Sequence, residues 1–289
     1  MQSQVLPFSL RVSAFMLSRL GKPFPGLTAR MFLSMYSTPP KRKLRDSHLA
    51  VREHAVLEKA AFSRYPFDDR PLTLSIYRWG QSDKKILLLH GWGGSPFDFR
   101  QMITALTAAG YEVITFDAPA HGASQGRKTN LIQWMHIIEQ LLQRTGPVHA
   151  IIGHSLGGLS AALTLVHKKV RVPRLVMVSA AVSAPVFFGE TFQIFGIPEK
   201  VMPKVQQLVI RRLKQDLLQL DLFQHIDQIK ADHIMVAYDE TDSIVREQQI
   251  DSFLQQYPAI TPLKIKGEGH FRIMKDPRVI EGVLEFIGK

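Results

Sequence analysis

The sequence predicts an α/β fold built on a mostly parallel sheet and preceded by a helical arm. Short apolar runs such as residues 85–89 and 148–153 alternate with helical patterns along most of the 289 residues. Strands that are apolar on both faces and alternate with helices indicate a parallel sheet covered on both sides. The second observation is the turn Gly153–Gly157, which joins an apolar strand to a helix of small residues. This strand-to-helix context is the one that a G-x-S-x-G motif requires.

Residues 1–60 form the predicted arm. Apolar side chains at helical spacing and intervening Gly and Pro residues predict helices near residues 8–20 and 27–36, and a third from about 46 to 59. Apolar stripes of this kind either pack on a neighbouring domain or lie on a membrane surface. Packing is the commoner outcome, and it is the favoured interpretation here.

Residues 61–289 form the predicted main domain, which begins with a β-hairpin and continues as alternating strands and helices. The expected strands span residues 61–65, 72–79, 85–89, 111–116, 148–153, 174–179, 233–238 and 262–266. The expected helices span residues 97–109, 129–144, 156–167, 243–257 and 276–287.

One stretch, at about residues 184–225, departs from this alternation. It is rich in Phe, Pro and Gly at first and then helical. A long excursion from the end of a strand is a candidate lid over an active site. Its aromatic residues Phe187, Phe188 and Phe192 are candidates for lining an acyl pocket, although such rings also pack a lid onto the body of a protein.

The net charge of +11 is concentrated at the start of the chain. Residues 1–60 hold ten Lys or Arg and three acidic residues, and therefore carry +7 of that total. A basic segment suggests contact with anionic lipid, or otherwise a solvated basic surface. Because no nucleic-acid reader motif accompanies it, we expect no nucleic-acid partner.

The absence of cysteine excludes disulfides and thiolate metal sites, and it fits a reducing compartment. No apolar run reaches the ~20 residues that span a bilayer, and the start of the chain lacks a compact signal-peptide pattern. We therefore expect a cytoplasmic protein that is a candidate for peripheral contact with an anionic membrane, at its inner face, through the basic arm. No metal site is predicted.

The G-x-S-x-G turn places Ser155 where a nucleophile stands clear of a sheet, with a strained backbone and a positive φ. A nucleophilic serine needs a base, and the base needs an orienting carboxylate. Among eleven histidines, His270 is the best base because it follows the last strand, at the edge where Ser155 lies. Asp242 follows the strand at 233–238 and is the preferred carboxylate, with Asp239 in reserve.

An acyl-transfer site also needs two N–H donors for the developing oxyanion. One is the backbone of Leu156, the residue after the nucleophile. The other is expected from the glycine-rich loop that follows residues 85–89, and Trp92 is the chosen donor.

Together these motifs resemble the α/β-hydrolase superfamily over roughly residues 72–289. The residues that carry the resemblance are His90–Gly94, Asp117–Ser124, Gly153–Gly158, Asp242–Val245 and Gly269–His270. The resemblance implies an α/β-hydrolase fold with a mostly parallel eight-stranded sheet, an antiparallel first hairpin and a helical lid inserted after the sixth strand. It also implies Ser155, Asp242 and His270 as a catalytic triad, and no cofactor. Serine at the turn argues against the superfamily's dehalogenases and epoxide hydrolases, which carry aspartate there.

The leading hypothesis is a serine hydrolase that cleaves a small-molecule carboxylic ester or thioester through an acyl-enzyme on Ser155. One alternative is an acyltransferase that uses the same triad, with an alcohol or thiol in place of water. Another is a non-catalytic, membrane-associated binding protein that keeps the fold.

Overall fold

The computed structural model describes residues 8–68, 70–168, 170–214 and 216–289. The chain divides into two compact units. One joins the segment that ends at Thr38 with Ser183–Asp221, and the other comprises Pro39–Val182 and Leu222–Lys289. The predicted arm of residues 1–60 is thus divided between the two units.

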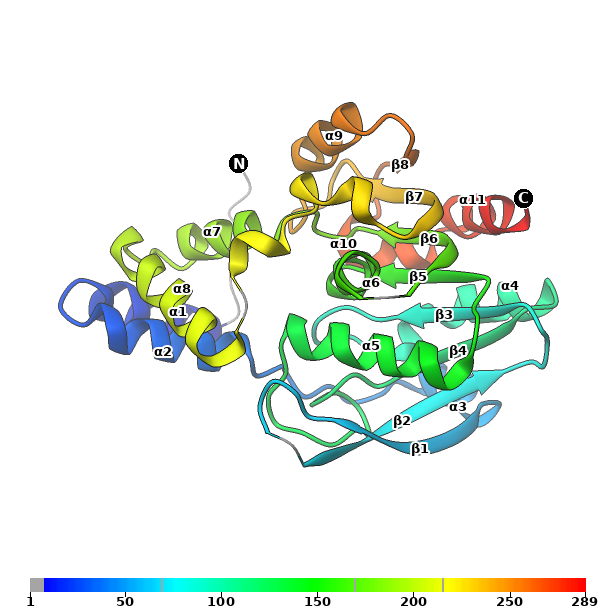
Figure 1. The fold of residues 1–289 in the computed structure, drawn as a ribbon, viewed down its shortest axis with the longest axis horizontal. Coiled ribbons are helices and arrows are strands. Elements are labelled where there is room, and N and C mark those ends of the chain that lie inside the picture. The colour runs from blue at the N-terminus through cyan, green and yellow to red at the C-terminus, as the bar shows by residue number, and fades with distance from the viewer. Residues whose placement is uncertain (1–7, 69, 169, 215) are drawn as a thin grey trace. The chain divides into compact units, whose positions relative to one another are not determined.

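The larger unit contains the sheet. Among the described residues, eight strands form one sheet in the order β1-β2-β4-β3-β5-β6-β7-β8 (Figure 1). They are β1 (Val56–Ser63), β2 (Pro71–Trp79), β3 (Lys85–Leu89), β4 (Glu112–Phe116), β5 (Ala150–His154), β6 (Val172–Val178), β7 (Ala231–Asp239) and β8 (Thr261–Ile265). The pairs β1–β2 and β2–β4 are antiparallel, and all other neighbours are parallel. This confirms the mostly parallel eight-stranded sheet with an antiparallel first hairpin.

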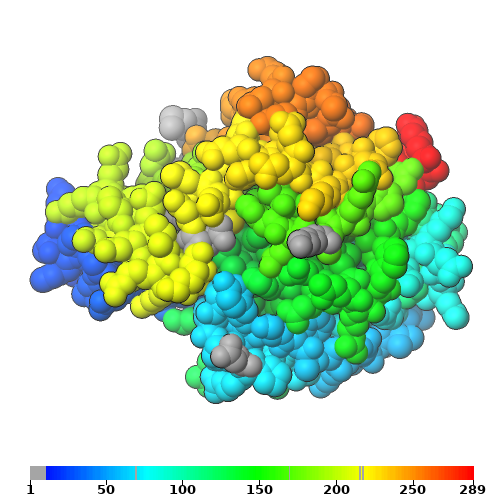
Figure 2. All heavy atoms as spheres, viewed as in Figure 1, coloured from blue at the N-terminus to red at the C-terminus, as the bar shows by residue number. Residues whose placement is uncertain are grey.

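Helices cover both faces of the sheet. They are α3 (Asp46–Glu53), α4 (Arg100–Ala108), α5 (Leu131–Thr145), α6 (Leu156–His167), α9 (Glu247–Gln256), α10 (Gly269–Arg272) and α11 (Pro277–Gly288). α5 packs beside α6 on one face, and α4 packs beside α11 on the other (Figure 1). In the space-filling view, the green surface over the sheet belongs largely to the chain around α5 and α6 (Figure 2).

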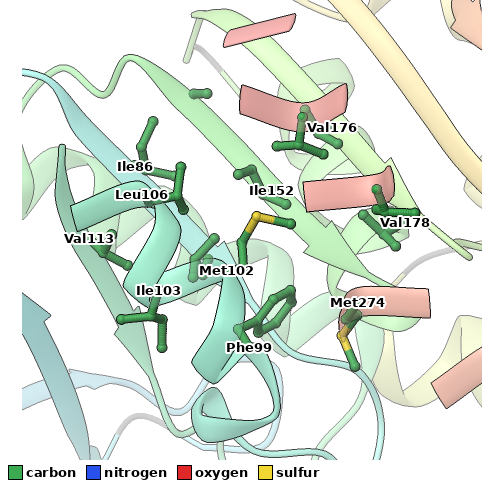
Figure 3. Close-up of a cluster of buried hydrophobic side chains, with 14 of the residues drawn as sticks. Ile86, Phe99, Met102, Ile103, Leu106, Val113, Ile152, Val176, Val178 and Met274 are labelled. Carbon is green, nitrogen blue, oxygen red and sulfur yellow. The ribbon is translucent and has the colours of Figure 1, made fainter. Parts of the chain in front are cut away.

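Alternating side chains of the central strands build the core on the α4 side. Ile86 and Ile152 point toward Met102 and Leu106 of α4 in one buried cluster (Figure 3). Successive side chains of a strand point to opposite faces, and Leu87 is fully buried as well. A strand buried on both faces must be apolar throughout, which explains the continuous apolar run at residues 85–89.

Three predicted boundaries are corrected. The third helix ends at Glu53 instead of continuing to residue 59, because residues 56–63 pair with β2 along their whole length. The alternating burial of Ala60 and Phe62 fits a strand and not a helix. The helix expected at 97–109 begins as a 3-10 turn, Pro96–Phe99, before α4 starts at Arg100. The helix expected at 243–257 is shorter, Glu247–Gln256.

The smaller unit is helical. It contains α1 (Phe8–Gly21), α2 (Pro25–Tyr36), α7 (Ala184–Ile194) and α8 (Met202–Leu213). Its core includes Phe32, which is completely buried, and Val205 of α8. The first two helices and the insertion after β6 therefore share one hydrophobic core. The insertion expected at about 184–225 corresponds to Ser183–Asp221, and the residues after Asp221 belong to the larger unit.

Candidate active site

Ser155 occupies the turn between β5 and α6 with φ 52° and ψ −121°. The predicted positive φ is therefore present. The turn is so tight that a Cβ on Gly153 would lie 2.5 Å from the backbone nitrogen of Gly158, and one on Gly157 would overlap the carbonyl of Leu89. Glycine at these two positions lets the strand end and the helix begin around Ser155.

The structure brings Ser155, His270 and Asp242 into one hydrogen-bonded chain. The His270 Nε2 lies 3.0 Å from the Ser155 Oγ, and its Nδ1 lies 2.8 Å from the Asp242 Oδ2. These residues come from the turn after β5, the loop after β7 and the short helix α10, which begins just after β8. Parallel strands end at the same edge of the sheet. Asp242 and His270 therefore meet Ser155 there, although they lie 87 and 115 positions after it in the sequence. His270 belongs to a helical turn instead of the expected loop.

Asp242 is the partner of His270, and Asp239 has a different task. The Asp242 Oδ1 accepts hydrogen bonds from the N–H groups of Ile244 and Val245, at 2.8 and 2.9 Å. Burial acts to raise the pKa of Asp242, but hydrogen bonds led by that from His270 outweigh it and hold the pKa below its ordinary value. Asp242 is therefore an anion at neutral pH and favours His270 with its proton on Nδ1.

Asp239 holds the loop that carries His270. Its carboxylate accepts hydrogen bonds from the backbone N–H of Thr241 at 2.6 Å and from that of Glu268 at 2.8 Å. The Thr241 hydroxyl donates to the same carboxylate at 2.5 Å. Asp239 is completely buried, and these bonds tie the end of β7 to the residues just before His270.

The loop His90–Gly94 lies against Ser155. A Cβ on Gly91 would lie 2.9 Å from the Ser155 Cβ, so only glycine fits at this approach. The N–H of Gly93 donates to the His121 Nε2 at 2.9 Å, and that of Gly94 donates to the Gly91 carbonyl at 3.0 Å. Trp92 lies between Gly91 and Gly93, and Leu156 opens α6 directly after Ser155. The placement of the loop agrees with an oxyanion-binding role, while the donor roles of Trp92 and Leu156 stay predictions.

Three buried histidines, one in this loop and two beside it, are neutral. Burial lowers the pKa of His90 to about 3, that of His154 to about 3 and that of His121 to about 4. Their hydrogen bonds fix the tautomers: the Nε2 atoms of His90 and His121 accept from backbone N–H groups, so their Nδ1 atoms donate to the Gly91 and Pro119 carbonyls.

His154 supports the base itself. Its Nε2 lies 2.8 Å from the backbone carbonyl of His270, to which it donates. The sequence indicated no role of their own for these three histidines. The signal that would have revealed them is the strand order β4-β3-β5, which brings the ends of these three strands side by side.

Residues upstream of β1 also contact the His90–Gly94 loop and the turn that follows it. The sequence did not indicate these contacts. The Arg42 guanidinium donates to the Asp98 Oδ2 at 2.8 Å, and the Ser95 N–H donates to the same atom at 2.9 Å. A Cβ on Gly93 would lie 2.9 Å from the Pro40 Cγ. The segment before α3 therefore braces the Gly93 side of the loop.

The three candidate pocket residues of the insertion belong to α7, in the smaller unit. The ring centroid of Phe188 lies 4.6 Å from that of Tyr36, and the ring centroid of Phe192 lies 4.9 Å from that of Phe32. Phe187 also contacts Tyr36, with 6.5 Å between ring centroids. These contacts with α2 make the three rings part of that unit's packing, and their role in lining an acyl pocket stays a prediction.

Comparisons with known proteins agree with this architecture. A family model described as "alpha/beta hydrolase fold" matches residues 84–219. The chain is 28% identical over 127 residues to a pyrethroid hydrolase of Sphingobium wenxiniae, covering 43% of this chain and 45% of that protein. It is 40% identical over 116 residues to the magnesium-chelatase 30 kDa subunit of Rhodobacter capsulatus, covering 38% of this chain and 40% of that one. The chain thus spans less than half the length of these two relatives.

A solved structure is similar over most of the chain. The esterase Pf2001 of Pyrococcus furiosus superposes with a TM-score of 0.65 at 19% identity, covering 87% of this chain and 98% of that one. This similarity concerns the fold, which the sheet order and the turn at Ser155 also define. The sheet, the serine turn and the family match together show that the chain has the α/β-hydrolase fold.

Proposed function

We propose that the protein is a serine hydrolase that cleaves carboxylic esters or thioesters through an acyl-enzyme on Ser155. The observation that carries this proposal is the hydrogen-bonded chain from the Ser155 Oγ to His270 and on to Asp242, with separations of 3.0 and 2.8 Å. Nucleophile, base and orienting carboxylate stand in the geometry that acyl transfer requires.

In the proposed reaction, the Ser155 Oγ attacks the substrate carbonyl while its proton passes to the His270 Nε2. Asp242 keeps the ring oriented and stabilises the imidazolium that forms. Negative charge on the carbonyl oxygen is stabilised by the N–H groups of Trp92 and Leu156, at the positive end of α6. His270 then protonates the leaving alcohol or thiol. It next takes a proton from water, which attacks the acyl-enzyme, and it returns that proton to the Ser155 Oγ as the bond to the acyl group breaks and the acid leaves.

The comparisons support ester hydrolysis in general terms. A pyrethroid hydrolase and the esterase Pf2001 of Pyrococcus furiosus are among the similar proteins. The substrate is proposed to be a small-molecule ester or acyl compound.

The test is hydrolysis of p-nitrophenyl esters and acyl thioesters of graded chain length by the wild type and by Ser155→Ala. Ser252→Ala is the matched control, because Ser252 is an exposed residue of α9. We expect the Ser155 variant to lose at least about a thousandfold in kcat and the control to match the wild type.

Product analysis with added alcohols and thiols separates the two enzymatic hypotheses. Release of the free acid as the main product supports a hydrolase, and transfer of the acyl group in preference to water would favour an acyltransferase. A folded Ser155→Ala protein that keeps full activity would refute both.

A further inference from the structure

The outward face of α1 is apolar in its centre and basic at its ends. Arg11, Val12, Phe15, Met16 and Arg19 are all exposed, and their spacing of i, i+1, i+4, i+5 and i+8 places them on one face of the helix. Phe15 is 62% exposed, while Val12 and Met16 are each 44% exposed. The opposite face contains Leu17, which is buried in the helical unit. The helix is thus anchored by one stripe and exposes a second apolar stripe.

The turn into α2 continues this composition. Phe24 is 57% exposed and Leu27 is 49% exposed. Lys22 and Arg30 are exposed beside them in sequence. α1 and α2 contact each other, so these side chains belong to one helical hairpin, which is blue in Figures 1 and 2. We name the exposed side chains of residues 11–30 the hairpin surface.

The charge on the hairpin surface has one sign. Residues 8–38 contain Arg11, Arg19, Lys22 and Arg30 and no acidic residue. The Arg19 guanidinium lies over the Phe15 ring, 5.4 Å from its centroid. A cation is therefore held directly beside the most exposed apolar side chain of the helix.

Of three partners, an anionic bilayer, a second copy of the chain and a nucleic acid, the bilayer best fits exposed bulky apolar side chains with cations beside them. The interface of an anionic bilayer takes apolar side chains at the acyl boundary and meets Lys and Arg with its phosphates. A two-fold contact with a second copy would bring the arginines of both copies together. A nucleic acid would use the cations but leave the central apolar stripe without a partner.

A helix of the length of α1 would lie on a membrane surface and would not cross the bilayer. In the part of the chain that the structure describes, no helix is both long enough and apolar enough to span a membrane. α1 has 14 residues, which is short of the ~20 that a bilayer requires.

We propose that the hairpin surface docks the protein on an anionic lipid membrane, with Val12, Phe15 and Met16 inserted among the headgroups. This goes beyond the proposed hydrolase function and does not depend on it, because binding is measured without a substrate.

The experiment is co-sedimentation of the full chain with phosphatidylcholine vesicles, with and without 30% phosphatidylglycerol. Wild-type protein is expected to bind the anionic vesicles at least tenfold more tightly than the neutral ones, and to lose most of this preference at 0.5 M salt. The double variant Phe15→Ser, Met16→Ser is expected to weaken binding at least tenfold. Phe67→Ser, at a 40% exposed phenylalanine of the sheet unit, is the apolar control and is expected to bind like the wild type.

A second pair of variants tests the charges separately. Arg19→Gln is expected to lower the partition onto anionic vesicles by about fivefold, while Arg127→Gln, an exposed arginine of the sheet unit, leaves it unchanged. Equal binding to neutral and anionic vesicles would overturn the proposal. So would variants of α1 that bind like the wild type, or sedimentation without vesicles, which would indicate self-association.

Discussion

The Nε2 atom of His121 accepts a hydrogen bond from the backbone N–H of Gly93 at 2.9 Å. This bond joins the loop after β4 to the loop after β3, next to Ser155. Gly93 has φ +65° and meets Pro40 on its other side. Contacts with His121 and Pro40 therefore help to fix the position of the glycine loop, which its own five residues would not fix alone.

Removing the acceptor at residue 121 should impair the reaction without touching the triad. We expect His121→Ala to lower kcat by about 10- to 100-fold, because a small displacement of positioned donors has effects of that size. His121→Gln should keep most of the activity, since the amide oxygen can take the place of Nε2. Steady-state kinetics on one ester checks this, with KM changing much less than kcat. Equal losses in both variants would contradict the positioning role.

The two aspartates after β7 should have separable effects. Asp242→Asn is expected to lower kcat by about 10³- to 10⁴-fold with little change in thermal stability, because it removes the orienting anion of His270. Asp239→Asn should mainly destabilise, by about 1–3 kcal/mol, because its amide group would face an N–H donor such as that of Glu268. Kinetics and thermal unfolding of both variants test the assignment, and an exchange of the two phenotypes would refute it.

Stability should fall in mild acid because of the buried histidines. Burial lowers the pKa values of His90, His121 and His154 from 6.5 to about 3, 4 and 3. A group whose folded pKa is lowered stabilises the fold above the unfolded pKa and loses that contribution as the pH falls toward the folded value. Between pH 7 and pH 5, the unfolded state gains protons that the folded state does not. The free energy of unfolding therefore falls by about 2 kcal/mol per histidine.

Urea unfolding of the wild type and of His121→Gln at both pH values measures this effect. Between pH 7 and pH 5, the free energy of unfolding of the variant should fall by about 2 kcal/mol less than that of the wild type. Identical losses in the two proteins would show that His121 does not contribute in this way.

Gly153, two residues before Ser155, should not tolerate a side chain. Gly153→Ala would place its Cβ 2.5 Å from the Gly158 nitrogen, so we expect a loss of about 1–3 kcal/mol and a displaced Ser155. Gly189→Ala is the control, because a Cβ there meets nothing within 4 Å and the residue lies inside α7. Alanine there should be neutral or stabilising by about 0.5–1 kcal/mol. Thermal unfolding and esterase assays compare them, and a fully active, stable Gly153→Ala protein would contradict the packing argument.

The sequence predicted the parts of the fold in which local pattern and tertiary context agree. The continuous apolar run of β3 and the small-residue helix α6 occupy the predicted residues, because a strand buried on both faces and a helix packed on the sheet leave such patterns. Ser155, His270 and Asp242 were predicted because the ends of parallel strands share one edge. The start of β1 was missed, since residues 56–59 show no alternation that distinguishes a strand from a helix.

Contacts distant in sequence were not predictable in the same way. The bond from Gly93 to His121 spans 28 positions, and that from Arg42 to Asp98 spans 56. No sequence pattern links the two partners of either pair. The order of the strands brings the loops of Gly93 and His121 together, whereas Arg42 lies upstream of the first strand. The packing of Phe192 against Phe32 likewise joins the insertion to the second helix, although each segment shows only an apolar stripe in sequence.

Labelling with a fluorophosphonate, measured by intact mass on wild type, Ser155→Ala and His270→Ala, tests directly whether Ser155 is an activated nucleophile. We expect one probe per wild-type molecule, none on Ser155→Ala and much slower labelling of His270→Ala, because only a serine activated by its histidine displaces fluoride rapidly. A folded wild-type protein that does not react, or a Ser155→Ala protein that labels as fast as the wild type, would contradict this role of Ser155.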